Sequence, residues 1–368
     1  MKRRAGAAVA ACAVLLASCG LVGEEAVDLD ARSAECTADQ IDGNLNLYNW
    51  SEYIDPALLD AFREQFDVEV TETFYDSNET MLAQIDAGGA AYDLIVPSDY
   101  MVQTMAEAGL LVPLNRDVLP NLVNLDPLFA APPFDPEGTY SVAYQWGTTG
   151  IGFSYDVVPD PEQLSWGIIF DPAMSAPVAG RIQMLNDERE TLGAALKYLG
   201  HSVNTTDPNQ INAAAELIRE SKERIATFDS DAYDNLLVSG ETLIGHGYNG
   251  NWFTAFDEAD AWEEFGYAVP IEGGTAWIDN MAIPVTAEAV CTAHTFINFI
   301  LDAENGAALT NHNFYASPNA AAEEFILPEI LEDPAIYPPR EVMEKLEFIA
   351  GVGEASTLFA DAFVAAKS

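Results

Sequence analysis

The sequence is poor in basic side chains. Among its 368 residues, 15 are lysine or arginine and 59 are aspartate or glutamate, which gives a formal net charge of −44. Nucleic acids and anionic membrane surfaces are poor partners for such a chain, because both attract positive charge. A negative field favours cationic solutes, but an acid-rich, lysine-poor surface also suits a high-salt habitat. Composition alone leaves both explanations open.

Motifs of the common enzyme classes are also missing. The four histidines are scattered without metal-ligand spacing, and the chain has no Gly-x-Ser-x-Gly elbow, phosphate-binding loop or Asp-x-Asp-x-Asp-Gly calcium loop. We therefore expect neither catalysis nor a cofactor or metal. Because paired carboxylates and aromatic rings would also suit a glycan substrate, a carbohydrate-active hydrolase stays open as an alternative.

No apolar run reaches the roughly 18 residues that a membrane-spanning helix needs. Residues 2–4 are basic and residues 5–17 are apolar, a pattern typical of a signal peptide over residues 1–18. The following Cys19 ends the string LASC, which resembles the lipobox of bacterial lipoproteins. We expect lipidation of Cys19, a flexible acidic tether over residues 19–43, and an extracytoplasmic protein anchored to the cell membrane on its periplasmic side or at the cell surface.

Cysteine is scarce, with four residues in the chain. Cys12 falls in the signal peptide and Cys19 in the lipobox, so that Cys36 and Cys291 remain. Two remaining cysteines of an exported protein often pair, and we expect a structural disulfide between them. Two separate thiols are the alternative, whereas redox chemistry is disfavoured because no Cys-x-x-Cys motif is present.

Strand and helix patterns alternate along the chain. Strands are expected at residues 45–49, 68–74, 92–96, 182–185 and 242–247, and helices at 56–66, 79–87, 101–108, 191–199, 210–221 and 287–301. This alternation predicts an α/β fold with helices on both sheet faces, and about 350 residues exceed a single core, so that two lobes are expected. Ligands of such sheets bind at the carboxyl ends of strands.

Aromatic rings and carboxylates occur together at several distant points. Residues 50–53 (WSEY) place two rings and a carboxylate on a turn after the first expected strand. Asp187 and Glu190 share a face at an expected helix start, where the helix dipole favours their ionised form. Asp279 lies beside Trp277 in an apolar strand, where a carboxylate needs a positive partner. An organic ammonium ion would pair with these carboxylates while ring faces cover its methylenes.

Each of these groups also has an ordinary structural explanation. Glu52 would be solvated at a strand end, Asp187 and Glu190 would cap a helix, and Asp279 would stabilise a turn. Aromatic residues are more often buried in a core than functional. Residue types alone therefore leave both interpretations open.

The order of several short strings resolves this ambiguity. From about residue 45 to the C-terminus, the chain resembles the spermidine/putrescine substrate-binding proteins of bacterial ABC transporters. The matching strings lie at residues 48–53 (YNWSEY), 77–81 (SNETM), 92–100 (YDLIVPSDY), 146–152 (WGTTGIG), 186–190 (NDERE), 248–250 (YNG) and 272–279 (EGGTAWID). The resemblance implies a two-lobed type II periplasmic-binding-protein fold, with a hinge crossed more than once and a ligand in the interlobe cleft.

The resemblance also implies ligand residues of two kinds, aromatic walls and polar or acidic groups that hold ammonium ions. They are, in chain order, Trp50, Ser51, Glu52, Tyr53, Ser98, Tyr100, Asp187, Glu190, Tyr248, Trp277, Asp279 and Tyr315. Tyr248 stands where the spermidine-binding members that this chain resembles have tryptophan, and Ile349 aligns where they have glutamine. Both departures bear on the choice of polyamine and leave the class of ligand unchanged.

The function implied is that of a lipoprotein that captures spermidine or putrescine and delivers it to an ABC permease. Its partners would be the polyamine, the permease and, through lipid, the membrane, and the protein would be a monomer. A binder of another small organic cation is a further alternative. We expect lobe 1 over residues 44–146 plus 279–315, and lobe 2 over residues 147–278 plus 316–368.

Overall fold

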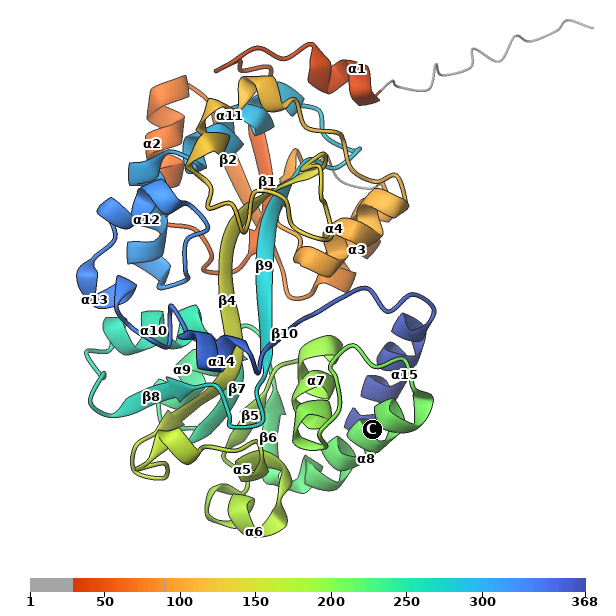
Figure 1. Ribbon diagram of the computed structural model, residues 1–368, viewed down its shortest axis with the longest axis vertical. Coiled ribbons are helices and arrows are strands. Elements are labelled where there is room, and N and C mark those ends of the chain that lie inside the picture. Colours follow the sequence, from red (N-terminus) through yellow and green to blue (C-terminus); the bar gives the residue numbers. More distant parts are fainter. Residues whose placement is uncertain (1–28, 89–90) are drawn as a thin grey trace, which may run out of the picture.

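A computed structural model describes residues 29–88 and 91–368, which form two lobes joined by long neighbouring strands (Figure 1). The signal peptide, Cys19 and the first part of the expected tether lie outside the described residues. β4 (Ser141–Ser154) and β9 (Thr275–Ala282) run antiparallel and pass through both lobes. The expected α/β fold with two lobes is present.

One sheet of ten described strands continues from lobe 1 into lobe 2. Its order is β2-β1-β3-β9-β4-β7-β5-β6, with β10 paired to β9 and β8 paired to β4. The strands are β1 (Leu45–Trp50), β2 (Val70–Tyr75), β3 (Leu94–Ile95), β5 (Ile182–Met184), β6 (Ile225–Phe228), β7 (Ile244–Tyr248), β8 (Phe265–Ala268) and β10 (Glu347–Phe348). β1 is parallel to β2 and β3, and β5 is parallel to β6 and β7, so each lobe has its own set of strand ends facing the other lobe.

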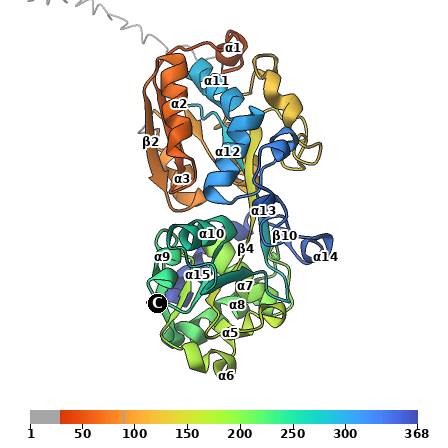
Figure 2. The same ribbon diagram turned by 90° about the vertical axis from the view of Figure 1, so that its left-hand side faces the viewer.

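Helices cover the sheet in both lobes (Figures 1 and 2). Lobe 1 carries α1 (Leu29–Ala34), α2 (Pro56–Phe66), α3 (Asn78–Asp86), α4 (Asp99–Glu107), α11 (Val290–Ile300) and α12 (Ala303–Asn313). Lobe 2 carries α5 (Gly167–Phe170), α6 (Pro172–Ser175), α7 (Glu188–Tyr198), α8 (Pro208–Ser221), α9 (Tyr233–Val238), α10 (Asn249–Glu258) and α15 (Ala355–Lys367), with α13 (Pro328–Leu331) and α14 (Arg340–Met343) beside the hinge. None of the helices in the described ranges combines the length and apolarity that crossing a membrane requires.

Local sequence explains why α2 begins and packs where it does. The Asp55 side chain accepts the Ala57 N–H as N-cap, and Pro56 occupies the first helical position, where its missing N–H costs nothing. Leu58, Leu59 and Phe62 then form one buried face. The expected bounds of residues 56–66 are therefore confirmed.

The hinge strand β4 is an element that sequence patterns did not indicate. Its residues 141–154 include several glycines, which weaken strand preference. Gly152 has a packing reason, because a Cβ at this position would lie 2.5 Å from the Trp252 ring. The close approach of this buried tryptophan depends on tertiary contacts that no local pattern reveals.

Three chain crossings connect the lobes at one level. Trp146 of β4 pairs with Ile278 of β9, and Ala316 forms a bridge to the other side of Trp146. The expected lobe boundaries at residues 146/147, 278/279 and 315/316 all fall at this level. These boundaries stay a prediction, since both long strands belong to the cores on either side.

The segment 29–43 departs from the expected flexible tether. Cys36 is joined to Cys291 in α11 by a disulfide, so the expected pairing is confirmed. The Ser33 hydroxyl lies 3.2 Å from Nε2 of His294, another residue of α11. Figure 1 shows α1 lying against the top of lobe 1 beside α11. From residue 29 onwards the tether prediction is therefore wrong.

The physical reason lies in polar groups that serve a distant helix. The carboxylate of Asp42 accepts the N–H groups of Cys291 and Thr292, which satisfies the first turn of α11. The side chain of Asp93 accepts the N–H groups of Glu288 and Ala289 and holds them outside the helix. Consequently α11 begins at Val290 instead of the expected residue 287, and Asp42, one of the acidic residues that suggested a tether, stabilises the fold.

Candidate functional site

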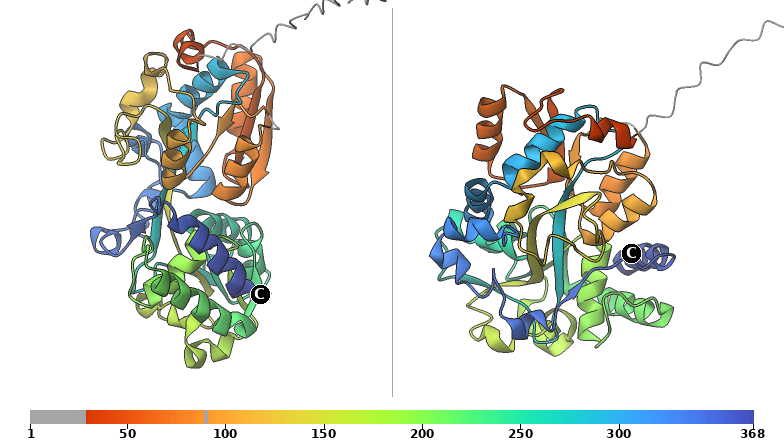
Figure 3. Two further views of the ribbon diagram at one scale, coloured as in Figure 1. Left: turned by 90° about the vertical axis from the view of Figure 1, so that its right-hand side faces the viewer. Right: turned by 45° about the horizontal axis from the view of Figure 1, so that its top comes forward.

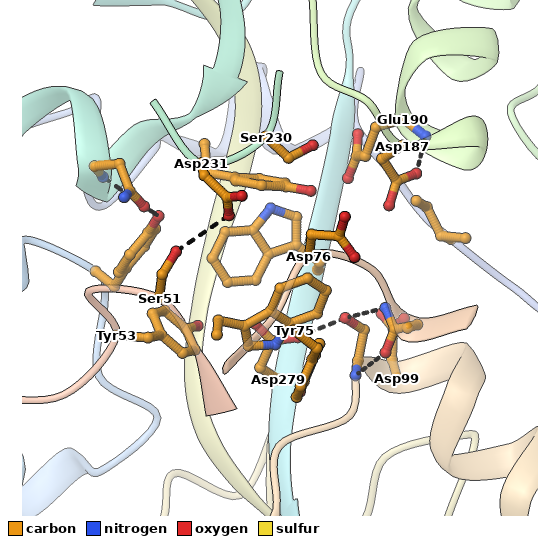
Figure 4. A pocket seen from close by; sticks show the side chains of 18 of the residues that line it. Ser51, Tyr53, Tyr75, Asp76, Asp99, Asp187, Glu190, Ser230, Asp231 and Asp279 are labelled. Carbon is orange, nitrogen blue, oxygen red and sulfur yellow. Dashed lines mark hydrogen bonds between the residues drawn. The ribbon is translucent and has the colours of Figure 1, made fainter. Parts of the chain in front are cut away.

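A cleft between the lobes gathers aromatic rings and carboxyl groups (Figure 4). Lobe 1 contributes the ends of β1 and β2 and the start of α4, and lobe 2 contributes the start of α7, the loop after β6 and the end of β7. β9 passes between them and presents Trp277 and Asp279, which share a face because side chains two apart on a strand do so. The cleft therefore lies at the carboxyl ends of strands, where ligands of α/β sheets bind.

Eleven of the twelve expected ligand residues line this cleft. They are Trp50, Ser51, Tyr53, Ser98, Tyr100, Asp187, Glu190, Tyr248, Trp277, Asp279 and Tyr315. The sequence analysis missed further residues that line the cleft, which are Tyr75, Asp76, Asn78, Asp99, Ser230, Asp231 and Asn251. Ile349 also lines the cleft, although it was noted only as a position where the chain differs from the family that it resembles. Several of these directly follow β2 or β6, so their position after a strand was an available signal.

Glu52 is the expected residue that the structure leaves out of the cleft lining. It adopts the left-handed conformation, with φ of 55°, in the turn after β1, and its side chain is exposed. The turn brings Ser51 and Tyr53 into the cleft and leaves Glu52 at the rim. Partial burial, followed by the negative charges of Glu258 and Asp231, raises the pKa of Glu52.

Four aromatic rings form one continuous wall. The ring centroids of Tyr53 and Tyr315 lie 5.0 Å apart, those of Trp277 and Tyr315 lie 5.3 Å apart, and those of Tyr248 and Trp277 lie 5.7 Å apart. Edge-to-face contacts at these distances are favourable and hold each ring in place. The wall is therefore preorganised to enclose a hydrocarbon chain or a cation.

A second pair of rings closes the lobe 1 side. The ring centroids of Trp50 and Tyr75 lie 4.5 Å apart. Trp50 Nε1 and the Tyr75 hydroxyl both donate to the carbonyl oxygen of Val96, at 3.0 and 2.6 Å. Both polar tips are thus occupied by backbone, so the rings offer apolar faces to the cleft.

Asp279 is a buried carboxyl group at the lobe 1 end of the cleft. The Ser98 hydroxyl donates to its Oδ1 at 2.6 Å, and the Tyr53 hydroxyl lies nearby without a hydrogen bond of good geometry. Burial raises the pKa of Asp279 to about 7, although the hydroxyls of Ser98 and Tyr53 act in the opposite direction. A positive charge at this carboxylate would lower the pKa again.

Asp187 and Glu190 lie together at the start of α7. The Asp187 side chain caps the helix by accepting the N–H groups of Arg189 and Glu190 at 2.8 and 2.9 Å. Glu190 accepts hydrogen bonds from the hydroxyls of Thr149 and Thr275. Burial, and then the charge of Asp187, raises the pKa of Glu190 to about 8. Burial also raises the pKa of Asp187.

Three further carboxyl groups line the cleft. Asp99 is buried, its Oδ1 accepts the N–H of Tyr100, and its Oδ2 has no hydrogen-bond partner. Asp76 and Asp231 are exposed at the mouth, where Asp231 accepts a 3.5 Å hydrogen bond from Ser51 of the opposite lobe. Figure 4 shows Asp76 and Asp231 in front of the buried residues.

The residues lining the cleft include no lysine, arginine or histidine. Arg189 follows Asp187, but its guanidinium donates to the Ala350 carbonyl and to Asn204 instead. The buried carboxyl groups are therefore left without a basic side-chain partner. Because isolated buried charges are costly, the site is suited to a ligand that brings its own positive charges.

This arrangement suits the binding of a cationic ligand. The lining residues contain no hydrogen-bonded Ser–His pair of the kind that activates a serine nucleophile. Among the residues that the structure describes, no group of three or more histidine, cysteine, aspartate or glutamate side chains is arranged to hold a metal ion. Rings and carboxyl groups together match the needs of an organic ammonium ion.

Comparisons with known proteins agree with this geometry. Residues 57–338 match the family model described as bacterial extracellular solute-binding protein. The spermidine/putrescine-binding periplasmic protein of Salmonella typhimurium is 35% identical over 325 residues, which cover 88% of this chain and 91% of that protein. The putrescine/cadaverine-binding protein of Pseudomonas aeruginosa is 36% identical over 326 residues, which cover 87% of this chain and 91% of that protein.

A solved structure also matches both lobes together. A putative spermidine/putrescine ABC transporter protein from Listeria monocytogenes superposes with a TM-score of 0.83 at 34% identity. The match covers 88% of this chain and 99% of that chain. The two-lobed periplasmic-binding-protein fold expected from the sequence is thereby confirmed.

Proposed function

Because the chain belongs to the family of bacterial extracellular solute-binding proteins, we propose that it captures a polyamine outside the cytoplasm and delivers it to an ABC permease. The ligand would be spermidine or putrescine, as the names of the relatives suggest. The observation that carries this proposal is the set of buried carboxyl groups among aromatic rings, with no basic side chain in the lining.

Each part of a polyamine has a matching part of the cleft. Asp279 holds one ammonium group at the lobe 1 end, and Asp187 with Glu190 holds another at the lobe 2 end. The wall of Tyr53, Tyr315, Trp277 and Tyr248 covers the methylenes between them. Burial strengthens each charge pair, because the surrounding dielectric is low.

Capture includes closure of the lobes over the ligand. The Ser51–Asp231 hydrogen bond already links the two lobes at the mouth. A polyamine between the acidic groups of lobe 1 and those of lobe 2 removes their mutual repulsion and favours the closed form. The closed protein then docks on the permease and releases its ligand there.

The localisation proposal rests on the sequence before residue 29. A signal peptide over residues 1–18 and lipidation of Cys19 would place the folded body outside the cell membrane on a lipid anchor. The residues between Cys19 and α1 would then link the lipid to the folded body. We propose a monomer that acts as a binding protein and not as an enzyme.

Calorimetry with a panel of ligands tests the proposal. Spermidine, putrescine and cadaverine are titrated into the chain from residue 20 onwards, alongside γ-aminobutyrate, glutamate and glucose. We expect saturable binding of the polyamines only. A protein that binds γ-aminobutyrate or glucose and ignores every polyamine would contradict the proposal, and release of reducing sugar from glycans would instead support the hydrolase alternative.

A further inference from the structure

A second hollow lies behind the hinge. It measures about 660 Å³ and is bordered by the loop at residues 126–134 of lobe 1, by the hinge strands, and by the segment from α13 to β10. Trp146 and Ile278 form its floor, and Ile278 alternates along β9 with the cleft residues Trp277 and Asp279. Because successive side chains of a strand point to opposite faces, the hollow and the cleft lie on opposite sides of β9.

Two views show that the walls of this hollow come from distant parts of the chain. In Figure 2 the yellow loop of lobe 1 and the blue segment around α13 and α14 lie on the same side of the hinge strands. Figure 3 shows the same arrangement from the opposite direction. The volume is within the roughly 300–1,000 Å³ range of small-molecule sites.

The walls are apolar and rich in aromatic rings. The Trp146 ring lies 5.8 Å from that of Phe129 and 6.0 Å from that of Tyr337. Leu128 and Phe348, which also line the hollow, remain 73% and 42% exposed. Large apolar side chains left open around one cavity mark a binding surface more often than a chance arrangement.

One carboxyl group supplies the polar feature. Asp99 lines both the hollow and the cleft, and only 3% of its surface is exposed. Its Oδ2 has no hydrogen-bond partner among the described residues. Burial raises the pKa of Asp99 well above its ordinary value, although the N–H groups of Tyr100 and Ile278 act in the opposite direction. A buried polar atom without a partner in a native fold needs an explanation, and a bound donor is one.

The charged side chains that line the hollow are all acidic. Asp126 and Glu323 join Asp99 among the lining residues, and none of those residues is basic. An aromatic monoamine would complement the hollow, because its ring would pack against Trp146 and Phe129 and its ammonium group would pair with a carboxylate. A neutral aromatic molecule would leave Asp99 unpaired.

We propose that the hollow behind the hinge is a second ligand site, which takes an aromatic monoamine with its ammonium group on Asp99. This site does not depend on the proposed polyamine function, because its walls are separate from the cleft except for Asp99, Tyr100 and Ile349. The hollow also differs from the cleft in the shape of ligand that it favours, since its single apolar volume suits one bulky group better than an extended chain.

The test uses 2-phenylethylamine as a probe and 2-phenylethanol as its uncharged counterpart. Each is titrated by calorimetry into the chain from residue 20 onwards, with and without saturating spermidine. We expect the amine to bind at one site and to keep binding when spermidine is present. The alcohol should bind at least about tenfold more weakly than the amine. Absence of amine binding at millimolar concentration, or equal binding of the alcohol, would overturn the proposal.

Variants separate the hollow from the cleft. Met343→Trp fills the hollow and should weaken amine binding about tenfold or more. Leu128→Arg places a positive charge at an exposed wall position and should act in the same direction without disturbing a core. Val364→Trp, on the exposed face of α15, is the matched control and should change nothing. Amine binding that survives both hollow variants but disappears with spermidine would assign the amine to the cleft and overturn the proposal.

Discussion

The Ser98 hydroxyl donates its hydrogen to Asp279 across 2.6 Å, although 181 positions separate the two residues in the chain. Asn78 Nδ2 donates to the same hydroxyl oxygen at 3.0 Å, which leaves the single hydrogen of Ser98 for Asp279. The ionised form of Asp279 has no hydrogen to donate, so it accepts from Ser98. The bond therefore prepares a buried carboxylate to receive a cation.

Asp279→Asn should weaken polyamine binding by about 2–5 kcal/mol, because it removes one partner of a desolvated charge pair. The unliganded protein should lose little stability or gain some, since a buried acid without a basic partner is removed. Calorimetry gives the affinity and thermal unfolding gives the stability. Asp361→Asn, at an exposed position of α15, is the matched control. Unchanged affinity in Asp279→Asn would exclude this residue from the site.

Acid should have opposite effects on stability and on binding. Burial raises the pKa of Glu190 to about 8 and that of Asp279 to about 7, both above their unfolded values. The folded, unliganded protein therefore binds extra protons. The stability that these two groups contribute is fully present below their unfolded pKa values of about 4 and is lost as pH rises from there to about 7 to 8. Polyamine binding needs the ionised carboxylates, so affinity should fall as pH drops below about 7.

Proton release distinguishes this mechanism from a general effect of pH. Calorimetry near pH 7 in buffers of different ionisation enthalpy should show that spermidine binding releases protons. Asp279→Asn should release fewer. Binding without proton release would mean that both carboxyl groups are already ionised in the empty cleft.

Loss of the disulfide should destabilise lobe 1 without removing the site. Cys36 and Cys291 are 255 positions apart, and a disulfide that closes a long loop stabilises by about 2–5 kcal/mol. The variant Cys36→Ser with Cys291→Ser should unfold at a lower denaturant concentration. Its polyamine affinity should stay the same, because the bond lies beside α1 and α11, away from the cleft. A large loss of affinity in the folded variant would link the segment 29–43 to ligand binding.

Cys19→Ser should release the protein from membranes. The expected lipid is attached at this residue, and a chain with 12 basic and 59 acidic residues after removal of the signal peptide, a net charge of −47, should not adhere to anionic lipid by charge. Fractionation of cells after a high-salt wash measures the effect. Membrane retention of the variant would contradict the lipobox interpretation.

Spermidine should bind more tightly than putrescine. Four buried carboxyl groups and two at the mouth line the cleft, and spermidine has three ammonium groups where putrescine has two. A buried carboxylate left unpaired costs about 1–3 kcal/mol, which corresponds to about a tenfold preference or more. The apolar Ile349 and the small ring of Tyr248 act against this preference. Competition calorimetry at fixed salt decides it, and equal or tighter putrescine binding would reverse the assignment within the polyamine class.

The sequence by itself determined the class of fold and most of the site. Alternating strand and helix patterns predicted two α/β lobes, and the ordered strings from residue 48 to residue 279 contain ten of the eleven expected residues that line the cleft, Tyr315 being the other. These predictions succeeded because residues after strand ends converge at one edge of a sheet, whatever the packing elsewhere. The Cys36–Cys291 pair was also foreseeable, since few cysteines remained to choose from.

Tertiary structure decided what depends on contacts between distant segments. It placed Glu52 at the rim, because the left-handed turn after β1 exposes that side chain. It folded residues 29–43 onto α11, because Asp42 caps a helix that begins almost 250 positions later. It also left Oδ2 of Asp99 without a hydrogen-bond partner between two cavities, a consequence of how α4 meets β9. Local patterns carry the periodicity of elements, whereas caps, burial and unpaired charges depend on which segments meet.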